Sequence, residues 1–346
     1  MIWRDWLHGW SISAVLDLPR LQRLKFVRRP FSQRFFGQFL HANYCWFPGV
    51  ELPLENPERI PDEPVLFAMN HTDRYNYFPF QYTLWKKFDR FTATWVKGKY
   101  YENGLLARFM ESMFQLPTVS RGYLITRDFV SVLGRMPTAL EYTLLREAVD
   151  ARAVGEAGTL PVPPDVPEML LRKRRNPLGV AHDPEEADYA DYICTLFHAM
   201  MRRFVELNRE ACDVGLDLLV FPQGTRSTRL LPGHTGIAQM ALHLEIPIVP
   251  IGCNGSDHVY PGGSPFGKKG RITYRVGDPI HYSDLAAFHI EEDYAPFSAT
   301  AERDFSEQFK AVAALVTDRI ESMLDSEYQR NPKAESAEER GAERFV

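Results

Sequence analysis

Short apolar runs recur along the chain, and polar segments or amphipathic segments separate them. The runs predict buried strands at residues 65–69, 92–96, 114–119, 216–221 and 246–251. Apolar residues at helical spacing predict helices over 105–113, 189–211 and 235–244. A further helix is expected to begin near Thr72 or Asp73, because both residue types are good N-caps. Strands that alternate with helices predict an α/β fold with a mixed central sheet flanked by helices.

The same pattern predicts how the chain is divided. Residues 1–55 are expected to form a basic, aromatic helical segment, and residues 56–330 to form the main domain. Residues 125–190 interrupt this domain and contain too few apolar residues for a core of their own, so they are interpreted as an insertion. Residues 331–346 are polar and charged, which predicts a flexible tail.

The N-terminal segment has the composition of a membrane-surface element. Residues 1–50 contain seven basic and two acidic residues, interleaved with many Trp and Phe. Basic side chains attract anionic lipid and aromatic rings suit the bilayer interface, although helices packed on the core with solvated arginines would also fit. The longest run without charged residues, 35–50, contains Gln, His, Asn and Pro. It is a poor membrane span. We therefore expect a peripheral or monotopic protein at the cytoplasmic face of a membrane.

Composition excludes several other classes. The net charge of −5 gives no support for nucleic-acid binding. Hydrophobic content of 45% and charged content of 25% are ordinary for a globular protein. The four cysteines lack the paired spacing of metal ligands, which predicts a reducing compartment and no zinc.

A histidine motif follows the first predicted strand and reads Asn70-His71-Thr72-Asp73-Arg74-Tyr75-Asn76. A histidine between a strand and a helix lies near the positive end of the helix dipole, which favours the neutral ring that a general base needs. The Asn76 side chain could supply the oxygen that fixes the tautomer. A histidine that only caps a turn is the simpler alternative for this motif taken alone.

A second motif follows the strand predicted at 216–221 and reads Phe221-Pro222-Gln223-Gly224-Thr225-Arg226-Ser227. Gly224 permits a tight turn with exposed backbone, Thr225 adds a hydroxyl, and Arg226 offers a planar fork for phosphate oxygens. An ordinary turn with a surface arginine is the alternative. Together the two motifs indicate transfer chemistry on a substrate that carries a phosphate.

With two further blocks, the chain resembles the glycerophospholipid acyltransferase family, the PlsC-like 1-acylglycerol-3-phosphate acyltransferases. The further blocks are Leu116-Pro117-Thr118-Val119-Ser120-Arg121 and Ile248-Val249-Pro250-Ile251. The resemblance covers about residues 65–125 and 205–280. It implies a glycerol-3-phosphate acyltransferase-like fold and transfer of a fatty acyl group to the hydroxyl of a lysophospholipid. The acyl donor would be acyl-CoA or acyl carrier protein, with no metal and no other cofactor.

The resemblance also implies roles for individual residues. His71 would be the general base that deprotonates the acceptor hydroxyl. The substrate-binding residues would be Arg121, Gln223, Gly224, Thr225 and Arg226 for the acceptor phosphate, Lys97 and Lys99 as weaker phosphate candidates, and Pro250 as a wall of the pocket. Partners would be the lysophospholipid, the acyl donor and an anionic membrane surface.

Two positions depart from the family's motifs, because Asn76 replaces an aspartate and Gln223 replaces a glutamate. Each change removes a negative charge. The sequence leaves three outcomes open: an active enzyme that uses His71 and Asn76, an active enzyme in which Asp73 supports His71, and a lipid-binding protein without activity. Asp73 would more simply cap the following helix. Acyl transfer to an acceptor without phosphate is a further alternative.

Overall fold

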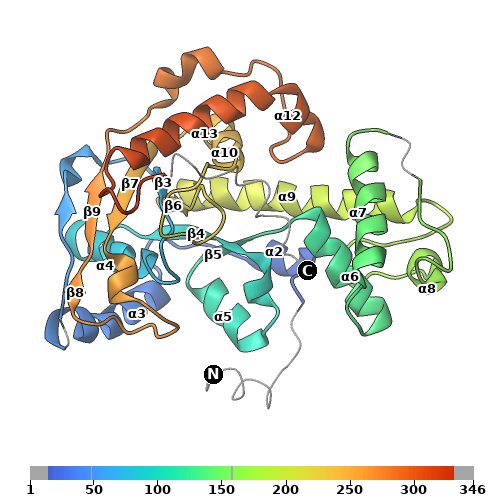
Figure 1. Ribbon diagram of the computed structural model, residues 1–346, viewed down its shortest axis with the longest axis horizontal. Coiled ribbons are helices and arrows are strands. Elements are labelled where there is room, and N and C mark those ends of the chain that lie inside the picture. Colours follow the sequence, from blue (N-terminus) through green and yellow to red (C-terminus); the bar gives the residue numbers. More distant parts are fainter. Residues whose placement is uncertain (1–14, 48, 157–158, 331–346) are drawn as a thin grey trace.

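The computed structural model describes residues 15–47, 49–156 and 159–330, whose arrangement is shown in Figure 1. Residues 1–14 of the predicted N-terminal segment and the tail predicted over 331–346 lie outside the described residues.

A mixed sheet forms the centre of the described structure. Its seven strands have the order β2-β9-β7-β3-β6-β4-β5. They are β2 (Leu54–Glu55), β3 (Leu66–Met69), β4 (Thr92–Lys97), β5 (Gln115–Thr118), β6 (Asp217–Val220), β7 (Ile248–Asn254) and β9 (Thr273–Val276). A separate parallel pair consists of β1 (Val50–Glu51) and β8 (Gly270–Arg271). The predicted mixed α/β fold is confirmed.

Parallel pairing brings five strand ends to one edge of this sheet. β7 and β9 pair antiparallel, whereas all neighbouring pairs from β7 through β3, β6 and β4 to β5 are parallel. In the centre, Phe67 of β3 lies between Leu219 of β6 and Val249 of β7. Ligands of open α/β sheets bind beyond the carboxyl ends of the strands. The segments that follow these five strands are therefore the expected place for a site.

The residues of β3 alternate between the two faces of the sheet. Leu66 and Ala68 belong to one buried apolar cluster, and Phe67 and Met69 belong to the other. Side chains of a strand alternate in this way because their period is two. All four residues are buried, as expected for a parallel strand covered on both faces.

Helices cover both faces of the sheet (Figure 1). One face packs against α9 (Tyr189–Asp213), α10 (Gly236–Leu244) and α13 (Ser306–Glu321). The other packs against α3 (Phe31–His41) and α4 (Tyr77–Phe88). The remaining helical segments are α2 (Leu18–Arg23), η1 (Ala42–Trp46), η2 (Pro57–Arg59), η3 (Gly98–Tyr101), α5 (Gly104–Ser112), α6 (Arg121–Leu133), α7 (Ala139–Ala153), α8 (Glu168–Arg172), α11 (Ser256–Val259), η4 (Tyr282–Phe288) and α12 (Ala299–Asp304).

The segment interpreted as an insertion is helical and packs against α9. Figure 1 shows α6, α7 and α8 grouped at one end of α9. Leu145, Val149 and Leu170 are fully buried and belong to the same apolar cluster as the inner side of α9. The segment thus shares the main core. Its classification as an insertion, like the other domain boundaries, stays a prediction.

The predicted elements agree with the structure except at the start of α4. The helix expected to begin near Thr72 or Asp73 begins at Tyr77 instead. The Asp73 side chain does not cap it, because Asp73 Oδ1 accepts a hydrogen bond from the backbone N–H of Tyr75 at 2.7 Å. This local bond stabilises a turn ahead of the helix.

Helix α3 and the residues after it expose a set of large aromatic side chains. Phe31, Phe35 and Phe39 lie one turn apart on the same side of α3. With Trp46 and Phe47 they form what we call the aromatic surface, in which each side chain is between 51% and 86% exposed. The opposite side of α3, including Leu40, is buried against α4. The described part of the segment predicted over residues 1–55 is helical up to Trp46 but ends in the short strands β1 and β2, and its boundary stays a prediction.

Within residues 15–330, apart from the short gaps, no helix combines the length and the apolar composition needed to cross a bilayer.

Candidate active site

The two motifs meet at the carboxyl edge of the sheet through the backbone of His71. The His71 N–H donates to Gln223 Oε1 at 2.8 Å, and the Ser227 N–H donates to the His71 carbonyl at 2.8 Å. His71 follows β3 and Gln223 follows β6, which are neighbouring parallel strands. Gln223 is buried, so its amide acts as a fixed support for the histidine peptide.

A second set of bonds anchors the histidine loop to β7. Asn70 Nδ2 donates to the carbonyl of Cys253 at 2.9 Å, and Asn70 Oδ1 accepts from the Cys253 N–H at 2.7 Å. Both polar groups of the buried amide are thereby satisfied by the backbone of one residue of β7. The backbone just before His71 is consequently fixed between β6 and β7.

The His71 ring is held in one tautomer by Asn76. His71 Nδ1 lies 3.1 Å from Asn76 Oδ1, while Asn76 Nδ2 donates to the Asn70 carbonyl at 2.8 Å. A carbonyl can only accept, so the network directs the Asn76 amide oxygen toward the ring and assigns the proton to Nδ1. The unprotonated Nε2 is then the nitrogen able to accept a proton. Sequence reasoning anticipated this contact.

The surroundings of His71 favour the neutral ring. Its imidazole stacks on Phe221, with ring centroids 4.0 Å apart and planes 20° apart. Burial lowers the pKa of His71 to about 4, the hydrogen bond to Asn76 opposes this shift, and the charges of Arg226 and Lys97 lower the pKa further. His71 is therefore neutral across the physiological pH range.

Asp73 is engaged elsewhere. It is buried, and its carboxylate accepts from the Tyr75 N–H and from the Thr72 hydroxyl, the latter at 3.0 Å. Burial raises the pKa of Asp73, and these hydrogen bonds oppose the shift. Since His71 Nδ1 already faces Asn76, the carboxylate supports the turn that carries the ring and does not hold the ring itself.

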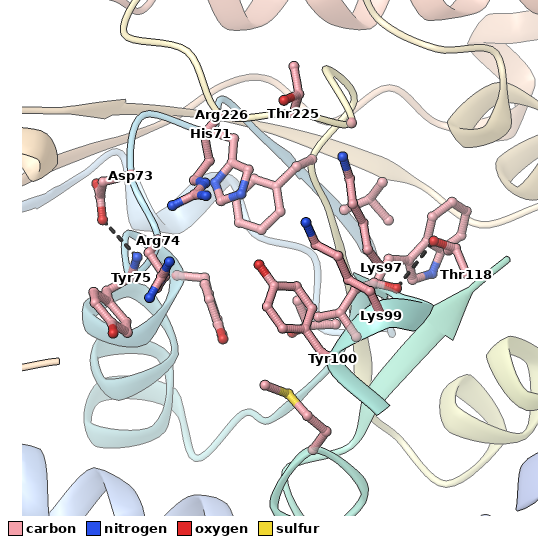
Figure 2. A pocket seen from close by; sticks show the side chains of 18 of the residues that line it. His71, Asp73, Arg74, Tyr75, Lys97, Lys99, Tyr100, Thr118, Thr225 and Arg226 are labelled. Atoms are coloured by element: carbon pink, nitrogen blue, oxygen red, sulfur yellow. Dashed lines mark hydrogen bonds between the residues drawn. The ribbon is translucent and has the colours of Figure 1, made fainter. Parts of the chain in front are cut away.

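The loop after β6 places Arg226 beside His71 (Figure 2). Gly224 has φ +62°, a conformation that suits glycine, and a Cβ there would meet the His234 ring at 2.7 Å. Arg226 is exposed, and Arg74 of the histidine motif is exposed nearby. Neither guanidinium forms an ion pair with any residue in the described part of the chain.

These groups line a large cavity of about 1910 Å³ along the carboxyl edge. Figure 2 shows His71, Arg74 and Arg226 on one side, with Lys97, Lys99 and Tyr100 on the other. The cavity also reaches apolar residues of four helices, namely Phe36 of α3, Phe78 of α4, Leu106, Phe109 and Met110 of α5, and Ile237 of α10. One space thus combines an imidazole, several cations and room for an apolar chain.

Five cationic and three acidic side chains line this cavity. The cations are Arg74, Lys97, Lys99, Arg127 and Arg226, and the acids are Asp73, Glu102 and Asp257. This excess of positive charge suits an anionic ligand.

Three predicted substrate-binding residues do not line the cavity. Arg121 turns to the other side of α6, where its Nε lies 3.1 Å from Asp150 and its guanidinium lies over Phe197. Pro250 is buried inside β7, opposite Ala68 of β3. Gln223 is also buried, and its Oε1 accepts a hydrogen bond from the His71 N–H. A role for these three residues in substrate binding stays a prediction.

The structure adds cavity residues that the sequence did not single out. Arg127 is six residues after Arg121 on α6, and a helix turns by about 100° per residue, so the two arginines face different sides. Its Nη1 lies 3.1 Å from Glu102. His234, expected to be a surface or turn residue, is exposed as predicted but packs on Gly224 at the cavity wall. Spacing along the chain gave no signal for either contact.

Comparison with known proteins gives a consistent picture. Residues 196–254 match the acyltransferase family model. The chain is similar to a 1-acyl-sn-glycerol-3-phosphate acyltransferase of Limnanthes douglasii, with 31% identity over 96 residues, 27% of this chain and 34% of that protein. It is also similar to one of Cocos nucifera, with 33% identity over 88 residues, 25% of this chain and 29% of that protein.

The chain spans about a third of the length of these curated relatives. Among solved structures, it is similar to the 1-acyl-sn-glycerophosphate acyltransferase PlsC from Thermotoga maritima, with a TM-score of 0.37 and 12% identity. That alignment covers 89% of this chain and 80% of the other. The predicted resemblance to the PlsC-like acyltransferase family is confirmed by the family match and the curated relatives.

Proposed function

We propose that this protein is an acyltransferase that moves a fatty acyl group from a thioester to the hydroxyl of a lysophospholipid such as 1-acylglycerol-3-phosphate. The observation that carries the proposal is that His71, whose Nδ1 lies 3.1 Å from Asn76 Oδ1, lines one cavity together with Arg226. The curated relatives bear the name of this activity. The donor is acyl-CoA or acyl carrier protein, and the reaction uses no other cofactor.

His71 is the general base in the proposed reaction. Its Nε2 takes the proton of the acceptor hydroxyl while the hydroxyl oxygen attacks the thioester carbonyl. An ester C–O bond forms, the C–S bond breaks, and the imidazolium returns the proton to the departing thiolate. Asn76 keeps the ring in the tautomer that this step needs, and Arg226 binds the acceptor phosphate.

In this proposal the protein acts at an anionic membrane surface and does not cross the membrane. Arg34 is exposed on the same helix as Phe31, Phe35 and Phe39, and Arg23, Lys25 and Arg28 are exposed in the segment that precedes it. Aromatic rings and basic side chains together suit the headgroup region of a bilayer. Because Phe36 of α3 lines the cavity, α3 joins the proposed membrane contact to the site. The cytoplasmic face is the proposed location.

A lipid-binding protein without turnover is the second candidate. The uncharged Asn76 supports an imidazolium less well than an aspartate would, and the low pKa of His71 makes it a weak base. This candidate binds lysolipid in the same cavity but transfers no acyl group.

Transfer of a radiolabelled oleoyl group from oleoyl-CoA to 1-oleoylglycerol-3-phosphate by the purified protein tests the proposal. We expect product formation, and a loss of about 10²–10⁴-fold in kcat for His71→Ala, because general base catalysis contributes about that much. His198→Ala, an exposed histidine of α9 outside the cavity, is the matched control. Activity that survives His71→Ala would refute the mechanism, and lysolipid binding without product would favour the second candidate.

The same assay decides whether the acceptor carries a phosphate. Arg226→Ala should raise the KM for 1-oleoylglycerol-3-phosphate by about tenfold, since a charged hydrogen bond is lost. Full activity of this variant would point to a lipid acceptor without phosphate.

A further inference from the structure

The far wall of the cavity carries cations that the proposed acceptor site leaves unused. Lys99 is exposed in η3, and Arg127 projects from α6. Arg127 pairs with Glu102 through Nη1, but its buried Nε has no hydrogen-bond partner within the described residues. The Arg127 side chain is 18% exposed, so part of it is accessible from the cavity that it lines.

Charge is distributed unequally between the two walls. On the His71 side, Arg74 and Arg226 are matched in number by Asp73 and Asp257. On the far side, the three cations Lys97, Lys99 and Arg127 outnumber the single carboxylate of Glu102. The excess positive charge of the cavity therefore lies on the wall formed by β4, η3 and α6.

The order of the strands sets the distance between these walls. His71 follows β3, and α6 follows β5, with β6 and β4 between them. Neighbouring strands are about 4.8 Å apart, so three steps place the end of β5 about 14 Å from the end of β3. Arg127 lies beyond that point on α6.

This distance discriminates between the two substrates. In a lysophospholipid such as 1-acylglycerol-3-phosphate, the reacting hydroxyl and the phosphate are on neighbouring carbons, so that phosphate must bind near His71. In acyl-CoA and acyl carrier protein, the long pantetheine arm separates the thioester from the nearest phosphate. Cations that lie far from His71 are therefore in the right place for the phosphate of the donor and not for that of the acceptor.

We propose that Lys99 and Arg127 bind the phosphate groups of a phosphopantetheine thioester, with the pantetheine arm lying across the ends of β4 and β5. This inference rests on the proposed acyl transfer. Thr118, Tyr123 and Thr126 line the same cavity, and their hydroxyl groups offer partners for the amides of the arm. Glu102 holds the Arg127 guanidinium in place at the cost of partly neutralising it.

A donor series tests the assignment with the full-length protein. The probes are oleoyl-pantetheine, oleoyl-4′-phosphopantetheine, oleoyl-CoA and oleoyl-acyl carrier protein, each with 1-oleoylglycerol-3-phosphate as acceptor. For the wild type we expect a KM about tenfold lower for the phosphorylated donors than for oleoyl-pantetheine. Lys99→Ala and Arg127→Gln should each bring the ratio of the KM for oleoyl-pantetheine to the KM for a phosphorylated donor toward one. Glu102→Gln should increase this ratio.

Arg108→Gln is the matched control, because Arg108 is an exposed arginine of α5 outside the cavity. Thermal unfolding of each variant verifies folding, and Lys99→Ala, at an exposed position, keeps the test valid if Arg127→Gln is unstable. If the KM already falls with oleoyl-4′-phosphopantetheine, the site binds the phosphate that both carriers share. If the KM falls only with oleoyl-CoA, the site binds the nucleotide phosphates. Either result supports the site.

Two results would overturn the inference: a wild type with no preference for phosphorylated donors, or variants that raise the KM for the lysolipid alone. If no donor supports transfer, the proposed function fails separately. Calorimetric titration with CoA then decides the site, since weaker binding by Arg127→Gln than by Arg108→Gln supports it and equal binding refutes it.

Discussion

Asn76 determines how the His71 ring can act, because its amide makes two bonds of opposite polarity. The oxygen faces His71 Nδ1, and the nitrogen donates to the carbonyl of Asn70. An aspartate could make only the first of these contacts, since a carboxylate has no donor. Asn76 thus gives an imidazolium less electrostatic support than an aspartate would, but it completes the buried hydrogen bonds to His71 and Asn70.

Asn76→Asp should therefore move the acid limb of the activity to higher pH and lower the stability of the fold. The carboxylate raises the pKa of His71, so the acid limb of kcat/KM should move from about pH 4 to higher pH. The free energy of unfolding should fall by about 1–3 kcal/mol, because the Asn70 carbonyl loses its donor. Rate profiles between pH 3.5 and 8 and urea denaturation measure the two effects.

Asn103→Asp is the control for this substitution. The Asn103 side chain only accepts hydrogen bonds, from the N–H groups of Leu105 and Leu106, so an aspartate can replace it without losing a bond. An acid limb that does not move in Asn76→Asp would show that His71 is not the base.

At the scale of elements, strands were predictable where burial alone defines them. β3, β6 and β7 are buried on both faces, so each appears in the sequence as a mainly apolar run. The start of α4 was not predictable, because Asp73 bonds the Tyr75 N–H and not a helix terminus. The direction of Arg121 was also hidden, since its partner Asp150 belongs to a separate helix.

The candidate site was predictable in part for the same physical reasons. His71 and Asn76 are close in sequence, so a local turn suffices to bring them together. The support of the His71 peptide by Gln223 spans 152 positions and depends on the pairing of β3 with β6. The place of Arg127 at the cavity could not be predicted from the sequence, because it depends on the direction in which α6 runs.

Helix α3 makes the proposed membrane contact testable as one element. Replacing Phe31, Phe35 and Phe39 together by serine should weaken binding to phosphatidylserine vesicles by about 100-fold, if each ring contributes about 1 kcal/mol at the interface. Sedimentation with vesicles at low salt measures the change. The three side chains are exposed, so folding should be unaffected.

Leu140, Val162 and Met169, replaced together by serine, provide the control, because they are exposed apolar residues away from α3. Vesicle binding should persist in this variant. Equal loss in both triple variants, or undiminished binding of the α3 variant, would reject the aromatic surface as the contact.

At the scale of the whole molecule, the buried imidazole makes stability depend on pH. The pKa of His71 is about 4 in the folded protein and 6.5 in the ordinary, unfolded state. Between these values the unfolded chain binds more protons, so stability is complete above about pH 6.5 and declines as the pH falls toward 4. The contribution is up to about 3 kcal/mol, at about 1.4 kcal/mol per pKa unit.

Chemical denaturation at pH 7.5, 6, 5 and 4 should therefore show the wild type losing stability relative to His71→Ala as the pH falls. Comparing the two proteins removes the titration of the carboxylates, which both share. His258→Ala, at an exposed position, should follow the wild type. A constant difference between the wild type and His71→Ala would contradict the low pKa.

The central place of β3 has a consequence for how the protein is made. Leu66 pairs with Leu218 and Ile248, which the ribosome adds long afterwards. A nascent chain must therefore keep four consecutive apolar residues without strand partners until β6 and β7 emerge. Such segments are prone to aggregation while exposed. The centre of the sheet, and with it the bonds that fix the His71 peptide, can therefore form only late in synthesis.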